Sequence, residues 1–100
     1  AHASCPWLLT WDDHEVDNDY ADDISEQDDD PRLFLARRAA AYQAYYEHLP
    51  LPRRAAPFGA TMRLHAAAGF GNLLTLLMLD TRQYRSPHAC PPAGRRGSSR

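Results

Sequence analysis

Hydrophobic and polar positions divide the chain into short apolar stretches separated by long polar runs. The first apolar stretch, residues 6–10, is followed directly by acidic residues, so we expect a short buried strand whose carboxyl end leads into an acidic loop. Residues 16–30 show neither helical nor strand periodicity, and they predict a long surface loop.

A helix is predicted from residue 31 to about residue 47. Asp30 is a good N-cap residue, and Pro31 is tolerated in the first helical turn. Leu49-Pro50-Leu51-Pro52 should end the helix, because proline disfavours helical angles in the residue before it. The spacing predicts one apolar face and one polar face, formed respectively by Leu35, Ala39, Tyr42, Tyr46 and Leu49 and by Arg37, Gln43 and Glu47.

An antiparallel hairpin is predicted after a connecting loop at residues 53–60. Residues 62–67 and 73–79 are the expected strands, and the glycine-rich residues 69–72 form the expected turn. The second strand is apolar on both faces, so we expect it to be buried on both sides and central in a sheet. One helix cannot cover such a sheet, and the elements therefore predict a slice of a larger domain.

Composition adds a charge pattern to this picture. Eleven of the thirteen acidic residues lie in residues 12–30, and all eleven basic residues are arginine. Arginine favours bidentate carboxylate or phosphate partners, although a GC-rich coding sequence also explains the lack of lysine. We expect a partial domain over residues 1–90 and a disordered tail over 91–100, which is rich in Pro, Gly, Arg and Ser.

Other features narrow the function classes. The longest apolar run, residues 73–79, is too short to span a membrane, residues 1–10 do not look like a signal peptide, and no nucleic-acid specificity is evident. Cys5 and Cys90 are either bridged or free buried thiols; their spacing with His2 and His88 is too irregular to indicate a zinc site. The three tyrosines at 42, 45 and 46 are expected to lie in the core with solvated hydroxyls, rather than to form a binding platform.

Residues 10–18, Thr-Trp-Asp-Asp-His-Glu-Val-Asp-Asn, are the strongest candidate for chemistry. Asp12, Asp13 and His14 follow the expected strand at once, where oxygen and nitrogen donors for a metal ion would converge. A calcium loop of the EF-hand type is excluded, because the sixth and twelfth positions do not carry glycine and glutamate. The alternatives at this point are a metal or catalytic site and a solvated polar loop.

A second candidate lies in residues 79–85, Leu-Asp-Thr-Arg-Gln-Tyr-Arg. Asp80 and Arg82 follow the end of an apolar strand, which makes them a possible edge of a site. Equally, Asp80 can cap the turn and pair with an arginine.

Three segments together resemble the alkaline phosphatase D (PhoD-like) family. They are residues 10–18, residues 37–51 (Arg-Arg-Ala-Ala-Ala-Tyr-Gln-Ala-Tyr-Tyr-Glu-His-Leu-Pro-Leu) and residues 79–86 (Leu-Asp-Thr-Arg-Gln-Tyr-Arg-Ser), in the family's order and with similar separations. The resemblance implies an α+β fragment of a calcineurin-like metallophosphoesterase, whose fold is a two-sheet α-β sandwich, with one long helix and a hairpin in this chain.

The resemblance also implies a function. It is that of a secreted, periplasmic or cell-wall-associated phosphomonoesterase or phosphodiesterase, monomeric at full length, with Fe3+ and Ca2+ at its centre and a phosphate ester as substrate. Asp13 would be a metal ligand and Asp12 a weaker candidate for one, while His14 would contact the phosphate oxygen and assist the leaving group.

Residues 65–69, His-Ala-Ala-Ala-Gly, depart from the family pattern, and most ligands of a multinuclear centre have no counterpart in the chain. We therefore expect an internal segment that carries one metal-site loop and is inactive alone. The competing hypotheses are a non-catalytic acidic segment that binds calcium or a basic partner through residues 12–30, and a fragment that does not fold by itself.

Overall fold

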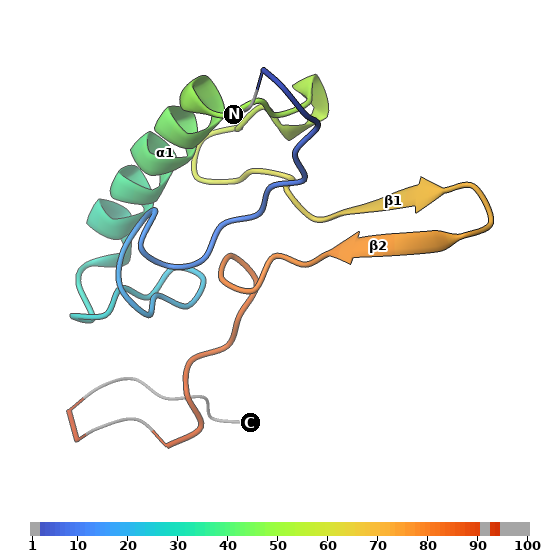
Figure 1. The fold of residues 1–100 in the computed structure, drawn as a ribbon. Helices are drawn as coiled ribbons and strands as arrows, with labels where there is room; N and C mark the ends of the chain where they lie inside the picture. Colours follow the sequence, from blue (N-terminus) through green and yellow to red (C-terminus); the bar gives the residue numbers. More distant parts are fainter. Residues whose placement is uncertain (1–2, 91–92, 95–100) are drawn as a thin grey trace.

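The computed structural model describes residues 3–90 and 93–94. It contains the helix α1 (Pro31–His48), the short 3-10 helix η1 (Arg53–Ala55), and the strands β1 (Ala66–Phe70) and β2 (Leu74–Met78). In Figure 1, α1 lies along one side and the β1–β2 hairpin projects from the other, with the segment before α1 running between them. Apart from residues 93–94, which form a turn, the predicted tail 91–100 lies outside the described residues.

The helix α1 begins where the sequence predicts. The Asp30 carboxylate accepts a hydrogen bond from the backbone N–H of Arg32 at 2.8 Å, and Pro31 occupies the first turn. The helix ends at His48, one residue beyond the predicted end, because Leu49 adopts an extended conformation before Pro50. The predicted helix is therefore confirmed.

The buried face of α1 is offset from the predicted one. The buried residues are Phe34, Arg38 and Tyr42, whereas Leu35 is only half-buried. Phe34 packs against Tyr20, with ring centroids 5.7 Å apart, so the chain before the helix selects this face. The predicted polar face is confirmed, since its members Arg37, Gln43 and Glu47 are all exposed.

The core is a small aromatic cluster between α1 and the segments on either side of it. Trp11 stacks on Tyr42 with ring centroids 4.2 Å apart, and the hydroxyls of Tyr42 and Tyr20 lie 3.2 Å from each other. The core placement of Tyr42 is confirmed, but its hydroxyl is buried and not solvated. The cluster consists of Trp11, Val16, Tyr20, Phe34, Tyr42, Ala55, Met62 and Leu64.

Two expectations for the first thirty residues are wrong. Residues 6–10 form no strand in the part of the chain that the structure describes, and Trp7 and Leu8 are 44% and 49% exposed, because no neighbouring strand offers backbone partners. Residues 16–30 have no regular structure, as predicted, but they are not simply a surface loop, because Val16, Tyr20 and Ser25 are buried. The expected buried thiol is also absent, since Cys5 and Cys90 are both exposed.

The predicted antiparallel hairpin is confirmed, with different bounds. Its register runs from Ala66 opposite Met78 to Phe70 opposite Leu74. The first strand starts four residues later than expected, because Met62 and Leu64 are buried in the core instead of pairing with β2. The turn lies at residues 71–73, where Gly71 adopts a positive φ of 56°.

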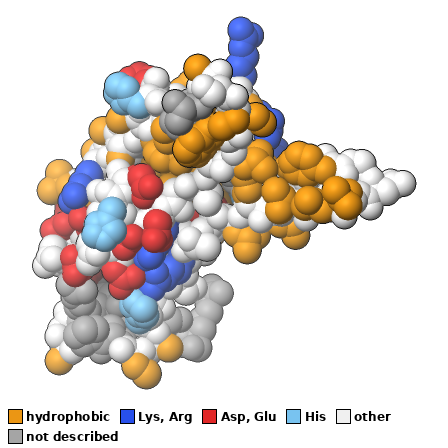
Figure 2. Space-filling view, in the orientation of Figure 1, with side chains coloured by type: hydrophobic (Ala, Val, Ile, Leu, Met, Phe, Trp, Pro, Cys, Tyr) orange, Lys and Arg blue, Asp and Glu red, His pale blue; other side chains and the backbone are white. Residues whose placement is uncertain are grey.

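The expectation that the second strand is buried on both sides is wrong for this chain. Leu74, Leu76 and Leu77 of β2 are 42%, 42% and 71% exposed. The space-filling view shows hydrophobic side chains along the projecting hairpin (Figure 2). The described sheet has two strands, and α1 lies on the far side of the core, so no described helix or strand covers either face of the hairpin. None of the described helices is long and apolar enough to cross a membrane.

Candidate functional site

A tight backbone turn at residues 13–17 gives the side chains of Asp13 and His14 different surroundings. The Asp13 carbonyl oxygen accepts hydrogen bonds from the N–H groups of Val16 and Asp17, each at 2.9 Å. Val16 enters the core, which anchors the far side of the turn. As a result Asp13 is buried, with 6% of its surface exposed, while the His14 side chain is 79% exposed.

The two oxygens of the Asp13 carboxylate have different surroundings. Oδ2 accepts a hydrogen bond from the Asp19 N–H at 2.7 Å and lies 3.5 Å from Nη2 of Arg82. Oδ1 lies 4.0 Å from Nε2 of His14. The Asp19 N–H lowers the pKa of Asp13 and outweighs burial, which acts in the opposite direction. Asp13 is therefore an ionised, buried carboxylate.

Arg82 brings the two candidate segments together across 70 residues of sequence. Its Nε and Nη2 both donate to Oδ1 of Asp12, at 3.0 and 2.9 Å, and its Nη1 donates to Oδ1 of Asp19 at 3.0 Å. The Arg82 side chain is only 14% exposed. The structure thus places Arg82 next to Asp12 and Asp13, as a site-edge position would require.

Asp80 caps the turn that carries Arg82. Its Oδ1 accepts hydrogen bonds from the N–H groups of Arg82 and Gln83, at 3.1 and 2.9 Å, and from Nε1 of Trp11 at 3.1 Å. The Thr10 hydroxyl also donates to the Leu79 carbonyl oxygen at 3.1 Å. We call this set of contacts the clasp; it joins Thr10, Trp11 and Asp12 to Leu79, Asp80 and Arg82.

The acidic residues behind the clasp are largely paired within the molecule. Asp19 contacts Nη1 of Arg85 at 3.0 Å and Nε2 of His88 at 2.8 Å, and the pKa of Asp19 falls to about 2, chiefly through His88. On the helix, Arg37 and Arg38 pair with carboxylates of the same loop, those of Asp17 and Asp22.

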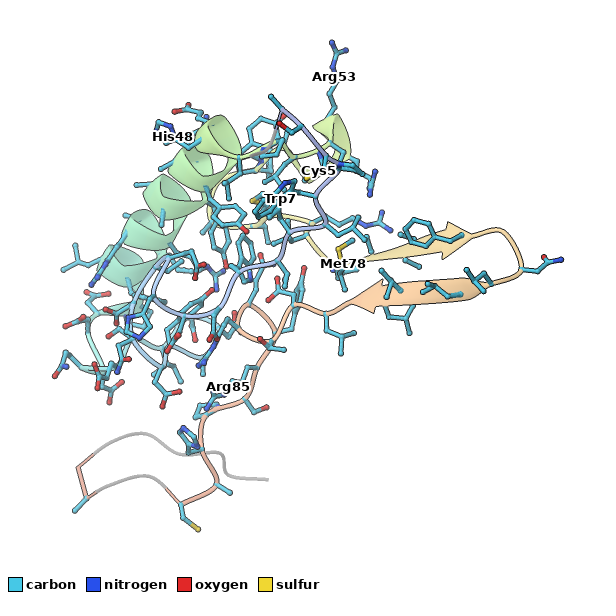
Figure 3. The ribbon with its side chains drawn as sticks, viewed as in Figure 1. Cys5, Trp7, His48, Arg53, Met78 and Arg85 are labelled. Carbon is cyan, nitrogen blue, oxygen red and sulfur yellow. The ribbon has the colours of Figure 1, made fainter. Side chains whose placement is uncertain are left out.

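These pairs place acidic, basic and histidine side chains side by side on one surface (Figure 2). Arg85 lies at the base of the segment that leaves this surface (Figure 3). Sequence reasoning missed Asp19, Arg85 and His88 as members of the site. The signal was present in the two arginines of residues 79–85, which complement the charge of the acidic block.

The described residues do not form a complete metal site. Within residues 3–90 and 93–94, no group of three or more His, Cys, Asp or Glu side chains is arranged to hold a metal ion. The zinc arrangement considered from the sequence includes His2, which lies outside the described residues. The buried, ionised Asp13 carboxylate has the donor chemistry of one metal ligand; its Oδ2 accepts the Asp19 N–H, and its Oδ1 lies 4.0 Å from Nε2 of His14.

The family of the chain follows from comparison with known proteins. The model of a family described as PhoD-like phosphatase matches residues 1–100. The chain belongs to the PhoD-like phosphatase family. It is 53% identical over 89 residues to alkaline phosphatase D of Bacillus subtilis (strain 168). The aligned region covers 89% of this chain. The resemblance noted in the sequence is therefore confirmed.

The fold of this PhoD-like chain also matches a solved structure of the same kind. A structure described as that of PhoD superposes with a TM-score of 0.81 at 54% sequence identity, covering 84% of this chain. The chain spans 15% of the length of the Bacillus subtilis protein and 16% of the chain in that structure.

Proposed function

We propose that this chain is the segment of a metal-dependent phosphomonoesterase or phosphodiesterase that supplies one loop of the metal centre. The observation that carries the proposal is the pair of neighbours Asp13 and His14, one a buried ionised carboxylate and the other an exposed imidazole. In a family of phosphatases, such a pair offers one group for a cation and one for the substrate.

Asp13 is the proposed metal ligand, and Oδ1 is the oxygen that would serve. Asp12 is the weaker candidate, because its Oδ1 already accepts two hydrogen bonds from Arg82. The proposed ions are Fe3+ and Ca2+, in line with the family resemblance and with the oxygen donors in the loop. When bound, such cations neutralise charge that develops on the phosphoryl oxygens. The remaining ligands would come from outside the described residues.

His14 is the proposed contact to the phosphate ester. The turn at residues 13–17 holds its ring outside the core while keeping it within 4.0 Å of the Asp13 carboxylate. An imidazole in this position can donate a hydrogen bond to a phosphate oxygen and a proton to the leaving oxygen. Exposure of the ring leaves it accessible to a substrate that approaches the loop from solvent.

The proposal extends to the whole protein. We propose that the exposed β1–β2 hairpin joins further strands of a two-sheet sandwich, since it is rich in apolar side chains and no described element covers either of its faces. Such a protein would be a secreted, periplasmic or cell-wall-associated monomer, as the family resemblance implies. The 100-residue chain alone would have little or no activity, because it offers one metal-site loop.

Replacement of Asp13 tests the proposed function. In the complete gene product, Asp13→Asn should lower bound iron and calcium and reduce hydrolysis of a chromogenic phosphate ester by at least about tenfold, because a ligand carboxylate is lost. Metal content by elemental analysis and initial rates on a monoester and a diester are the measurements. Asp23→Asn, a substitution in the same loop but outside the clasp, is the matched control and should change neither.

The same experiment separates the proposal from a non-catalytic acidic segment. If the complete protein binds calcium but hydrolyses neither ester with iron and calcium supplied, the phosphoesterase assignment fails. The internal pairing of Asp12, Asp17, Asp19 and Asp22 already argues against an acidic surface that is open to a basic partner.

A further inference from the structure

We propose that Arg82 is a positioning residue for the metal-site loop, which fixes the direction of the Asp13 carboxylate by holding Asp12 and Asp19 on its two sides. The inference rests on the proposed function, in which Asp13 is a metal ligand. It assigns a role to the segment at residues 79–85, which the proposed function leaves without one.

The contacts of Arg82 close a ring around Asp13. On one side, Nε and Nη2 donate hydrogen bonds to Oδ1 of Asp12, the residue that precedes Asp13 in the chain. On the other side, Nη1 donates a hydrogen bond to Oδ1 of Asp19, whose backbone N–H donates to Oδ2 of Asp13. The first route fixes the backbone that precedes Asp13 and the second reaches its carboxylate, so rotation of that carboxylate would break the charge-assisted hydrogen bond from the Asp19 N–H.

Arg82 is itself held in place from the opposite side. Its backbone N–H donates to the Asp80 carboxylate at 3.1 Å, and its carbonyl oxygen accepts the Asp22 N–H at 3.0 Å. All three guanidinium nitrogens contact carboxylates, and the side chain is 14% exposed. The geometry therefore points to an arginine that orients protein groups, and not to one that reaches out to a phosphate.

Two opposite effects of Arg82 on a cation must be weighed. Its positive charge, 3.5 Å from Oδ2 of Asp13, repels a cation at the same carboxylate. Its hydrogen bonds hold the ligand in one orientation, and partners of this kind beyond the ligands themselves typically change metal affinity by about 10–100-fold. A positioning role requires the second effect to be larger, so removal of the Arg82 guanidinium should raise the Kd for the cation.

The test uses metal affinity in the complete gene product. Metal-free wild-type, Arg82→Gln and Arg82→Lys proteins are titrated with Ca2+ by calorimetry, and iron content and the kcat and KM for a phosphate ester are measured in parallel. Arg37→Gln is the matched control, because Arg37 also pairs with an aspartate of the same loop but makes its contact with Asp17 from the helix surface.

We expect Arg82→Gln to raise the Kd for Ca2+ by about 10–100-fold and to lower kcat, with recovery of kcat at saturating metal. Arg82→Lys should fall between wild type and Arg82→Gln, because an ammonium keeps the charge but cannot bridge Asp12 and Asp19 as a planar fork does. Arg37→Gln should bind Ca2+ as wild type does. Recovery at high metal is a result that a general loss of folding would not give.

An unchanged or lower Kd in Arg82→Gln would overturn the positioning role, the lower value showing that charge repulsion is the larger effect. If Arg82→Gln does not fold, Arg82→Lys decides the matter in the same way, since an unchanged Kd in that variant overturns the role. Failure of the wild-type protein to bind metal or to hydrolyse either ester would instead overturn the proposed function, and with it this inference.

Discussion

Asp12 and Asp13 are adjacent residues with the same side chain, and the fold gives them opposite surroundings. Asp13 lies in the interior, where a backbone N–H keeps its pKa low. Asp12 has a side chain that is 73% exposed, and its Oδ1 accepts hydrogen bonds from Nε and Nη2 of Arg82. Two carboxylates one position apart are thus divided between a candidate ligand and an anchor for a guanidinium.

This division was only partly predictable. The sequence indicated a dense donor cluster at residues 12–14, and the structure buries Asp13 while it leaves His14 exposed to solvent. Their individual surroundings depend on Arg82 and Asp80, which lie about 70 residues further along the chain. Local spacing carries no information about which of two neighbouring aspartates accepts the hydrogen bonds of a distant arginine.

The buried tyrosine pair predicts a loss of stability in alkali. Burial raises the pKa of Tyr20 to about 12 and also raises the pKa of Tyr42, above the ordinary value of 10.0. The folded state therefore favours the neutral phenols, and their contribution is present below pH 10.0 and is lost as the pH rises toward about 12. Urea unfolding at a series of pH values, followed with tyrosinate absorbance, measures this loss.

The substitution Tyr42→Phe should weaken this alkaline dependence, since phenylalanine cannot ionise. Below pH 10.0 it should cost about 1 kcal/mol, the usual contribution of one hydrogen bond. Tyr84→Phe, at a tyrosine that is 61% exposed, is the control and should leave the pH dependence as it is. An equally steep loss of stability in Tyr42→Phe and wild type would contradict the explanation.

At the scale of elements, helix α1 shows what local signals can specify. Its ends follow from the capping residue Asp30 and from the proline after Leu49, and both were predicted. Its buried face was predicted only in part: Tyr42 is buried as expected, but Arg38 also turns inward, where it donates hydrogen bonds to the backbone carbonyls of Asp22 and Ala60. An arginine that satisfies carbonyl groups in the interior looks, in sequence, like any residue of a polar face.

The N-cap of α1 supplies a direct test at this scale. Asp30→Ala should lower the free energy of unfolding by about 1 kcal/mol, because the N–H of Arg32 loses its acceptor and the helix dipole loses a nearby negative charge. Urea denaturation monitored by circular dichroism is the measurement. Asp23→Ala removes an equal charge outside the helix, and a similar loss in that variant would show that net charge and not capping is responsible.

The bounds of the hairpin show what local signals cannot specify. Its existence followed from two apolar runs around a glycine-rich turn, and its register is regular. Its first strand starts late because Met62 forms two hydrogen bonds with the side chain of Gln83, which accepts from the Met62 N–H at 3.0 Å and donates to its carbonyl at 2.9 Å. A side-chain amide has taken the place of a strand partner, and periodicity cannot reveal this.

At the scale of the whole molecule, the hairpin stands apart from the core. Figure 1 shows β1 and β2 extending away from α1, and Leu77 is 71% exposed. A two-stranded sheet with no covered face has little to oppose local opening. We therefore predict that amide hydrogens of β1 and β2 exchange with solvent faster than those in the middle of α1, as measured by hydrogen–deuterium exchange mass spectrometry.

Two variants make this prediction specific. Leu77→Thr should leave the protection of α1 unchanged, because the side chain lies outside the core. Phe34→Ala should reduce it throughout, since a truncation of this kind in a core typically costs about 3–5 kcal/mol. Equal protection of the hairpin and the helix in the wild-type chain would show that something covers the hairpin in solution.

The charge pattern was the best whole-molecule signal in the sequence. Acidic residues gather before α1 and arginines follow, and the structure joins the two groups through the pairs Asp17–Arg37, Asp22–Arg38 and Asp19–Arg85. The preference of arginine for carboxylate partners, noted from the composition, is consistent with these pairs. The prediction of a strand at residues 6–10 was wrong, because such a strand needs a neighbouring strand that the described residues do not contain.

The clasp has a mechanical consequence. Thr10, Trp11 and Asp12 are tied to Leu79, Asp80 and Arg82, so the chain between them is a closed loop that contains both α1 and the hairpin. Tension applied to the two ends of the molecule would load the contacts of Arg85 and His88 with Asp19 and then these few hydrogen bonds, and would leave the loop slack. The Asp13 carboxylate would keep its orientation under strain until the clasp itself gave way.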